Sequence, residues 1–150
     1  MTPAPLLRPY VDADEAAAIE LWRRTWQEAY PAIDFSARLD WWRERWQREL
    51  VPGAAIVVAE RAGDLLGFVT VAVATGDIDQ IVVAPEAWGQ GVAEALLAEA
   101  KGLAPAGLDL KVNTDNARAI RFYRKHGFAI VGEDVNPRSG RPVYRMSWRP

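Results

Sequence analysis

The chain has 150 residues, of which 50% are hydrophobic and 25% are charged, and it contains seven tryptophans but no cysteine. This length favours one domain with a substantial core, and the missing cysteines exclude disulfides, thiolate zinc ligands and a cysteine nucleophile. The net charge of −2 and the single histidine argue against nucleic-acid partners, anionic membranes and a metal site, so no metal is expected.

The N-terminal third is expected to form one strand and two amphipathic helices. A strand is predicted over residues 6–9, and a capping box at residues 12–15 opens a helix through residue 28. Ser36 is the predicted N-cap of a second helix that reaches residue 50. Four tryptophans lie at helical spacing on these two helices, namely Trp22, Trp26, Trp42 and Trp46.

The rest of the chain alternates strands with helices. Strands are predicted over residues 54–61, 65–73, 77–83, 108–112, 128–135 and 143–148. Helices are predicted over residues 91–101 and 116–126, with Gly102 and Gly127 as their C-terminal stops. This order indicates one mixed α/β domain over residues 1–150, with parallel crossovers through residues 77–112 and in the unit that follows.

Neither a targeting segment nor a membrane span is expected. The start of the chain lacks the basic patch and long apolar stretch of a signal peptide. The most apolar stretch, residues 65–74, has about half of the roughly 20 residues that a membrane helix needs. A cytoplasmic location is therefore the expectation.

The most informative stretch is residues 81–97, where a strand runs into a glycine-containing turn that opens a helix. Gly89 and Gly91 allow a ligand to approach the backbone, and the first N–H groups of a helix carry partial positive charge. This combination indicates a cradle for a phosphate or pyrophosphate, and the alternative is an ordinary helix start with two flexible residues. Glu94, at the third glycine position, excludes a dinucleotide fingerprint, and the G-K-S/T of a P-loop is absent.

A second informative stretch covers residues 113–128, where Asn116 and Tyr123 are two helical turns apart and so share a face. Together, the two stretches resemble the GCN5-related N-acetyltransferases, the GNAT superfamily. The first matches the acyl-CoA pyrophosphate motif Q/R-x-x-G-x-G/A at Trp88, Gly91 and Ala93. The second matches the pattern N-x-x-A-x-x-x-Y-x-x-x-G-F at Asn116, Ala119, Tyr123, Gly127 and Phe128. The departure is Trp88, which stands where the family has Gln or Arg.

The resemblance implies a single-domain α/β fold of the mixed α+β type, in which about four helices flank a mostly antiparallel central sheet. It implies an acyltransferase that moves an acetyl group from acetyl-CoA to a primary amine by direct attack in a ternary complex. Two alternatives stay open, which are transfer of a different short acyl group and a non-catalytic acyl-CoA binding module.

The resemblance also implies where the cofactor binds. In the family, the strand before the turn carries a bulge and splays from the next strand, and the acyl arm enters that gap. A strand N–H near Val83 would then polarise the acyl carbonyl. Gln90 is a candidate polar contact in place of the missing Gln or Arg. The cofactor-binding residues that we expect are Ile81, Val82, Val83, Trp88, Gly89, Gln90, Gly91, Val92, Ala93 and Asn116.

Two residues are expected to carry the chemistry. Tyr123 occupies the family's general-acid position, where its phenol can protonate the departing thiolate, and the alternative is a packed tyrosine with its hydroxyl at the surface. Asp79 is the candidate general base for the acceptor amine. A water chain could do the same work, in which case Asp79 is a solvated carboxylate at the end of a strand.

By the same resemblance, the acceptor is a small-molecule or protein amine. The two N-terminal helices and residues 136–142 are expected to line its side of the site. Arg138 and Arg141 could attract an acidic acceptor, although solvated loop arginines are the default. Arg118 or Arg124 could contact the phosphates of the cofactor, although a solvated helix face is favoured. The resemblance also allows a homodimer.

Overall fold

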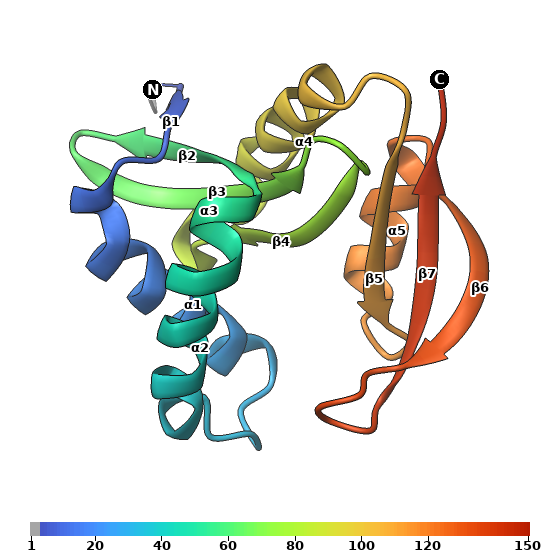
Figure 1. Cartoon of the computed structure of the whole chain (residues 1–150), viewed down its shortest axis with the longest axis horizontal. Helices are drawn as coiled ribbons and strands as arrows, with labels where there is room; N and C mark the ends of the chain where they lie inside the picture. Colours follow the sequence, from blue (N-terminus) through green and yellow to red (C-terminus); the bar gives the residue numbers. More distant parts are fainter. Residues whose placement is uncertain (1–3) are drawn as a thin grey trace.

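The computed structural model describes residues 4–150, so residues 1–3 of the predicted domain lie outside the described part of the chain. Its strands form one sheet in the order β1-β2-β3-β4-β5-β7-β6 (Figure 1). The strands are β1 (Leu6–Pro9), β2 (Ala55–Arg61), β3 (Asp64–Ala72), β4 (Asp77–Val83), β5 (Leu108–Asn113), β6 (Ala129–Val135) and β7 (Pro142–Trp148). The helices are α1 (Glu15–Ala29), α2 (Leu39–Arg45), α3 (Val51–Gly53), α4 (Val92–Leu103) and α5 (Ala117–Lys125).

Neighbouring strands are antiparallel except for β4 and β5, which run parallel on either side of the crossover through α4. The second predicted crossover, through α5, joins β5 to β6, which point the same way because each is antiparallel to β7 between them. The mostly antiparallel mixed sheet and both crossovers are therefore confirmed.

The part of the sheet built from β2, β3 and β4 is covered on both faces. β3 is buried without alternation over residues 66–71, which is typical of a strand between two layers. The centroid of the Phe68 ring lies 5.2 Å from that of Trp46, which belongs to the helical segment that follows α2. A Cβ at the preceding Gly67 would lie 3.1 Å from Leu96 of α4. In Figure 1, α1 and α2 accordingly lie on the opposite side of these strands from α4.

α2, a π-helical turn at Trp46–Leu50 and α3 follow one another without interruption over residues 39–53. Counted as one, this segment brings the flanking helices within residues 4–150 to the expected four. Wide π-helical turns are frequent near functional sites. Here the turn begins at Trp46, which is fully buried and donates from Nε1 to the Tyr10 hydroxyl at 3.1 Å.

The predicted caps of the first two helices are wrong by a few residues. Asp12–Asp14 form a 3-10 turn before α1, and the Asp14 carboxylate accepts the Val11 N–H at 2.9 Å, so the contact lies one residue before the predicted capping box. Arg8 fixes the Asp14 carboxylate at 2.8 Å, a long-range contact that a local capping pattern does not contain. Before α2, the Asp34 carboxylate accepts the Ala37 N–H at 3.3 Å, so Ser36 is not the cap.

The predicted stop at Gly102 is also wrong, because α4 continues through it to Leu103. The Ala104 N–H still donates to the Ala100 carbonyl at 3.0 Å, so the helical hydrogen bonds run past the glycine. Gly127 does end α5, with a φ of 92° that suits a left-handed C-terminal residue.

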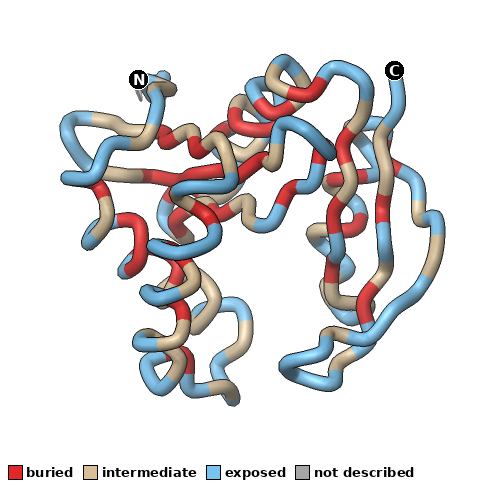
Figure 2. Tube along the Cα trace, in the orientation of Figure 1, coloured by how far each residue is buried: buried red, intermediate tan, exposed pale blue. Residues whose placement is uncertain are grey.

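The core lies where the helices meet β2, β3 and β4, as the buried segments of Figure 2 show. Trp22, Trp42 and Trp46 are 0–4% exposed, and the rings of Trp22 and Trp42 stack with centroids 4.5 Å apart. These tryptophans therefore belong to the core, and they fix α1 and α2 against the sheet. Over residues 4–150, no helix has both the length and the apolar character required to span a bilayer.

Candidate active site

β4 carries a bulge at Asp79. The register between β3 and β4 shifts so that Gln80 pairs with Thr70 but Ile78 pairs with the next residue, Val71. Asp79 is therefore the extra residue, and the Gln80 N–H donates to the Thr70 hydroxyl at 3.0 Å. Because a bulge bends its strand and re-aims its side chains, Asp79 and Gln80 both line the space beside β4. The bulge expected for this strand is confirmed.

β4 and β5 separate below their single paired position, Asp77 with Asp109, and Figure 1 shows them diverging. A cleft of about 910 Å³ occupies this region, bounded by α1 and α2 on one side and by β5, α5 and the β6–β7 loop on the other. The Ala84 N–H donates back to Leu66 at 2.7 Å. Antiparallel alternation therefore turns the backbone groups of Val83 away from β3, toward the gap.

The chain leaves β4 through a tight turn that presents backbone N–H groups at the start of α4. Gly89 and Gly91 have φ values of 77° and 85°, so both adopt left-handed conformations that favour glycine. The first helical bond is donated by Ala95 to Gly91, at 3.1 Å, which leaves the N–H groups of residues 92–94 without helical acceptors. This open, partly positive turn fits a pyrophosphate group, as its sequence predicts.

Trp88 connects this turn to the end of β4. Its indole Nε1 donates to the Val83 carbonyl at 2.8 Å. The guanidinium carbon of Arg118, from the first turn of α5, lies 4.4 Å from the centroid of the indole ring. Trp88, which stands at the motif position of Gln or Arg, therefore holds the turn against the end of β4. Arg118 brings a positive charge to the same turn.

The Gln90 side chain is engaged within the protein. Its Oε1 accepts from Arg61 at 3.0 Å, and its Nε2 donates to the Glu86 carbonyl at 3.0 Å. The backbone N–H of Gln90 is engaged as well, because it donates to the Ala87 carbonyl at 3.3 Å. The Glu86 carboxylate in turn pairs with Arg24 of α1 through two contacts of 2.7 Å, which ties the turn to α1. Hydrogen bonds from Arg24 lower the pKa of Glu86 to about 2.

Asn116 and Tyr123 both line the cleft, as their seven-residue spacing predicts. The Asn116 side chain caps α5 by accepting the Ala119 N–H at 3.2 Å. Tyr123 is 7% exposed and packs against the rings of Phe122 and Phe128. Burial raises the pKa of Tyr123 well above its ordinary value, so the phenol keeps its proton across the physiological range.

Asp79 is held in an ion pair that the sequence did not indicate. Both of its carboxylate oxygens accept hydrogen bonds from Arg45 of α2, which is 34 residues away along the chain. Arg45 also contacts Glu49 at 2.9 Å, and the Gln80 side chain donates to Asp79 at 3.3 Å. The predicted base thus lies in the cleft with its charge already compensated.

Aromatic side chains from α1, α2 and the segment between them form one wall of the cleft, and they include Trp26, Tyr30, Phe35, Trp41 and Trp42. The Tyr30 hydroxyl donates to Asp115 and accepts from Asn113, each at 3.0 Å, so it links α1 to the end of β5. Tyr30 and Trp41 were not predicted as site residues. The four-residue spacing of Trp22, Trp26 and Tyr30 on one helical face was the available signal for Tyr30.

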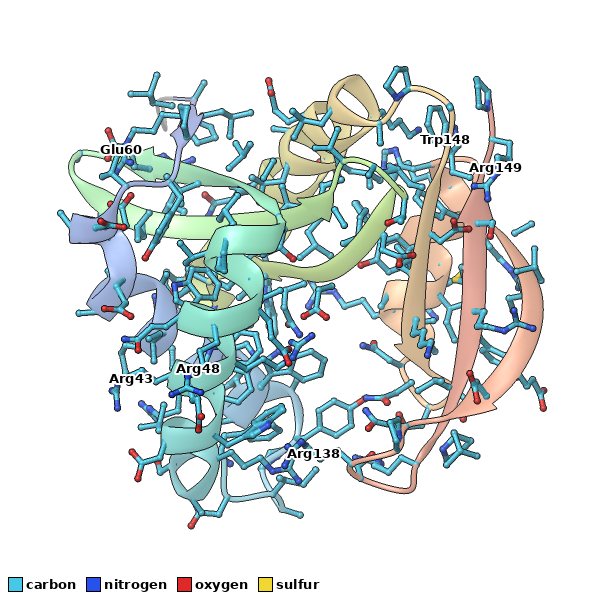
Figure 3. All side chains as sticks on the ribbon, in the orientation of Figure 1. Arg43, Arg48, Glu60, Arg138, Trp148 and Arg149 are labelled. Atoms are coloured by element: carbon cyan, nitrogen blue, oxygen red, sulfur yellow. The ribbon has the colours of Figure 1, made fainter. Side chains whose placement is uncertain are left out.

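The loop between β6 and β7 forms the facing wall, as expected for residues 136–142. Arg138 reaches across to α2, where its guanidinium carbon lies 3.6 Å from the centroid of the Trp41 ring, and Figure 3 shows it between the two halves of the molecule. Arg141 contacts Asp115 at 2.6 Å and lies over the Tyr30 ring. These contacts span the end of the cleft that is far from the phosphate turn.

Residues 16–128 match the family model described as the acetyltransferase (GNAT) family. The chain belongs to this family. It is 31% identical over 126 residues to the peptidyl-lysine N-acetyltransferase YjaB of Salmonella typhimurium, covering 83% of each chain. It is 29% identical to the peptidyl-lysine N-acetyltransferase YiaC of Escherichia coli, covering 95% of this chain and 96% of the relative.

Solved structures agree with the GNAT fold. The solution structure of apo-form YjaB from Escherichia coli superposes with a TM-score of 0.80 at 22% identity and covers 97% of this chain and 98% of that one. The PaiA N-acetyltransferase from Thermoplasma acidophilum, solved in complex with coenzyme A, superposes with a TM-score of 0.78 at 18% identity over 99% of this chain and all of that one. This GNAT protein is thus an N-acetyltransferase by family, and acetyl-CoA is the donor that its fold binds.

Proposed function

We propose that this GNAT protein transfers the acetyl group of acetyl-CoA directly to a primary amine, with lysine side chains of proteins as the acceptor class. The named activity of the relatives supports the acceptor class. The observation that carries the mechanism is that Asp79 of β4 and Tyr123 of α5 line the same cleft, beside the gap between β4 and β5. A cytoplasmic location and a homodimer remain predictions from the sequence.

The proposed donor site follows β4 and the turn after it. Acetyl-CoA supplies an acetyl thioester whose carbonyl carbon is open to attack by an amine. The N–H groups of residues 89 and 91–93 would hold the pyrophosphate, and the backbone of residues 81–83 with Asn116 would hold the arm. The Val83 N–H, turned toward the gap, would stabilise negative charge on the carbonyl oxygen.

The acceptor amine must lose a proton, because an alkyl ammonium with a pKa near 10 has no lone pair for attack. We assign proton removal to Asp79, whose carboxylate keeps lone pairs beyond those that Arg45 occupies. A chain of water molecules is the alternative, and the Asp79→Asn variant separates the two. Loss of turnover below about pH 9, with recovery at higher pH, supports Asp79, whereas an unchanged profile supports water.

We assign protonation of the departing thiolate to Tyr123. Its hydroxyl has no hydrogen-bond partner within residues 4–150, and the raised pKa of Tyr123 keeps the phenol in the acid form. A phenol can protonate a thiolate of ordinary pKa near 8.5 when the two are held within hydrogen-bond distance. The proton then passes from Tyr123 to the sulfur, and solvent or the released amine proton restores the phenol.

Release of free thiol from acetyl-CoA tests this function directly. The protein is incubated with acetyl-CoA and one class of amine at a time: lysine-containing peptides, free lysine, polyamines or aromatic amines. The products are identified by mass spectrometry. We expect an acetylated amine as the product. In a control without amine, we expect the mass of the protein to stay unchanged, because no acyl-enzyme forms. Binding of acetyl-CoA without thiol release for any amine would make the chain a non-catalytic acyl-CoA binding module. Faster turnover with propionyl-CoA than with acetyl-CoA would change the assigned acyl group.

A further inference from the structure

The cleft is positively charged although the chain as a whole has a net charge of −2. Six cationic side chains but only three acidic ones line it. The three acids are Glu44, Glu49 and Asp79. Arg45 of α2 engages Glu49 and Asp79, and Arg48 of the π-helical turn engages Glu44. Arg45 and Arg48 are thus already paired with the three acids. The excess positive charge of the cleft therefore comes from its other four cationic side chains.

Two of these cations have no carboxylate partner within the described residues 4–150. Arg38, at the end of the turn before α2, lies over the Phe35 ring with its guanidinium carbon 5.1 Å from the centroid. Arg138, from the β6–β7 loop, lies over Trp41 at 3.6 Å. The other two unmatched cations have acids outside the cleft, since Arg141 pairs with Asp115 and Lys111 lies 3.6 Å from Asp134.

An arginine held on an aromatic face is prepared to bind a carboxylate. The ring contacts the flat face of the guanidinium, while the five N–H donors point outward in the plane and match the two oxygens of a carboxylate. No side-chain hydrogen bond of Arg38 or Arg138 occurs within residues 4–150, so these donors are available to a ligand in the cleft. Phe35 and Trp41 also lower the entropy cost of fixing the two side chains.

We propose that the acceptor of this enzyme carries a carboxylate near its reactive amine, and that Arg38 and Arg138 bind that carboxylate in the cleft, between α2 and the β6–β7 loop. The preferred acceptors are then lysines flanked by acidic residues or small amines that themselves bear a carboxylate. The inference rests on the proposed function only in taking an amine as the group that is acetylated. The carboxylate contact itself is a binding property that can be measured without turnover.

Two matched pairs of ligands test the inference. One pair consists of lysine peptides of equal length in which the residues beside the lysine are glutamates or glutamines. The other pair is 6-aminohexanoate and its amide, which differ only in the carboxylate. Dissociation constants are measured by calorimetry with the protein saturated with coenzyme A, and kcat/KM is measured by thiol release with acetyl-CoA. We expect the charged member of at least one pair to bind about tenfold more tightly at low salt.

The variants Arg38→Gln and Arg138→Gln should each reduce this preference by about threefold, and the double variant should abolish it. Arg43→Gln is the matched control, because Arg43 lies on α2 shortly after Arg38 but is outside the cleft lining, and Figure 3 shows it pointing away from the cleft. It should leave the preference unchanged. Raising the salt concentration to about 0.5 M should also shrink the preference, because Arg38 is half-buried and Arg138 is exposed.

The two pairs distinguish the source of the carboxylate, since a preference confined to the peptides indicates acidic protein segments and one confined to aminohexanoate indicates a small acceptor. Equal binding of both members in both pairs overturns the inference. A preference that survives in the double variant also overturns it, because the carboxylate would then be bound elsewhere. If no amine is acetylated at all, the proposed function fails, while the calorimetry still decides whether the stacked arginines select a carboxylate.

Discussion

The indole N–H of Trp88 donates to the carbonyl of Val83 at 2.8 Å, which joins the phosphate turn to the strand that precedes it. Val83 is the last residue of β4, and its backbone is turned toward the gap where the family admits the acyl arm. The same indole ring lies under Arg118 of α5. One side chain thus fixes the relative positions of the strand end, the turn and the second helix of the proposed donor site.

We predict that Trp88→Phe lowers the free energy of unfolding by about 1 kcal/mol, because the ring remains but its hydrogen bond is lost. We also expect acetyl-CoA to bind several-fold more weakly, because the turn is less firmly held. Denaturant titration and calorimetry measure the two effects. Trp41→Phe is the control, since the Trp41 indole N–H makes no hydrogen bond within residues 4–150 and its ring lies beside Arg138 of the β6–β7 loop. Equal donor affinity in both variants would contradict the role given to Trp88.

Gly91 offers a test of the phosphate turn. At its φ of 85°, an alanine is strained, and its Cβ would lie 3.3 Å from the Glu94 carboxylate. We predict that Gly91→Ala costs about 1–2 kcal/mol of stability and weakens binding of coenzyme A. Gly102→Ala is the matched control, because that glycine lies inside α4 with nothing within 4 Å of its would-be Cβ. It should stabilise the fold by about 0.5–1 kcal/mol and leave donor affinity unchanged.

The order of strands and helices could be read from the sequence because each element carries its own local pattern. The strand, glycine turn and helix over residues 81–97 are fixed by neighbouring residues, and so is the cap at Asn116. The helix ends at Asp14 and Leu103 could not be read in this way. The first depends on Arg8, and the second depends on a glycine that has open space around it and no need to break the helix.

The site divides along the same line. Tyr123 and the glycine turn come from motifs whose spacing is local, and the sequence was enough to place Tyr123 and Asn116 on one face of α5 and the open turn before α4. The partner of Asp79, the crossing of Arg138 to Trp41 and the link from Tyr30 to Asp115 all join residues that are distant in the sequence. Such contacts depend on how α1, α2 and the β6–β7 loop pack around the splayed strands, and no pattern within one segment contains that information.

The pair of Arg24 and Glu86 predicts a pH dependence of stability. The pKa of Glu86 is lowered from an ordinary 4.5 to about 2, so its stabilising contribution is complete above pH 4.5 and is lost as the pH falls toward 2. Because the Glu86 side chain is 58% exposed, the contribution is below about 1 kcal/mol. Glu86→Gln should therefore be less stable than the parent at pH 7 and closer to it at pH 3. Glu28→Gln, which removes no ion pair within residues 4–150, should show no such trend.

Tyr30 links the acceptor side of the cleft to the end of β5. We predict that loss of its hydroxyl changes binding of the acceptor amine but not binding of acetyl-CoA. Tyr30→Phe deletes the hydroxyl that bridges Asn113 and Asp115 but keeps the ring beneath Arg141. We expect the KM for the amine to rise several-fold while the affinity for acetyl-CoA stays the same, because the donor site is formed elsewhere. Steady-state kinetics and calorimetry separate the two, and a change confined to acetyl-CoA binding would count against this arrangement.

Tyr123→Phe removes the proposed acid without emptying its place in the core, so the fold and the affinity for acetyl-CoA should be retained. We predict that kcat falls by about 100-fold at saturating substrates, because the thiolate loses its positioned proton donor.

The pH profile of the parent enzyme provides the second readout. Burial raises the pKa of Tyr123 above its ordinary value near 10, so the phenol does not ionise below that pH. The value of kcat/KM should therefore rise with pH as the acceptor amine loses its proton, without a descending limb before about pH 10. A descending limb at pH 8–9 that disappears in Tyr123→Phe would show that the phenol ionises earlier than its burial implies. Unchanged kcat in Tyr123→Phe would remove Tyr123 as the acid.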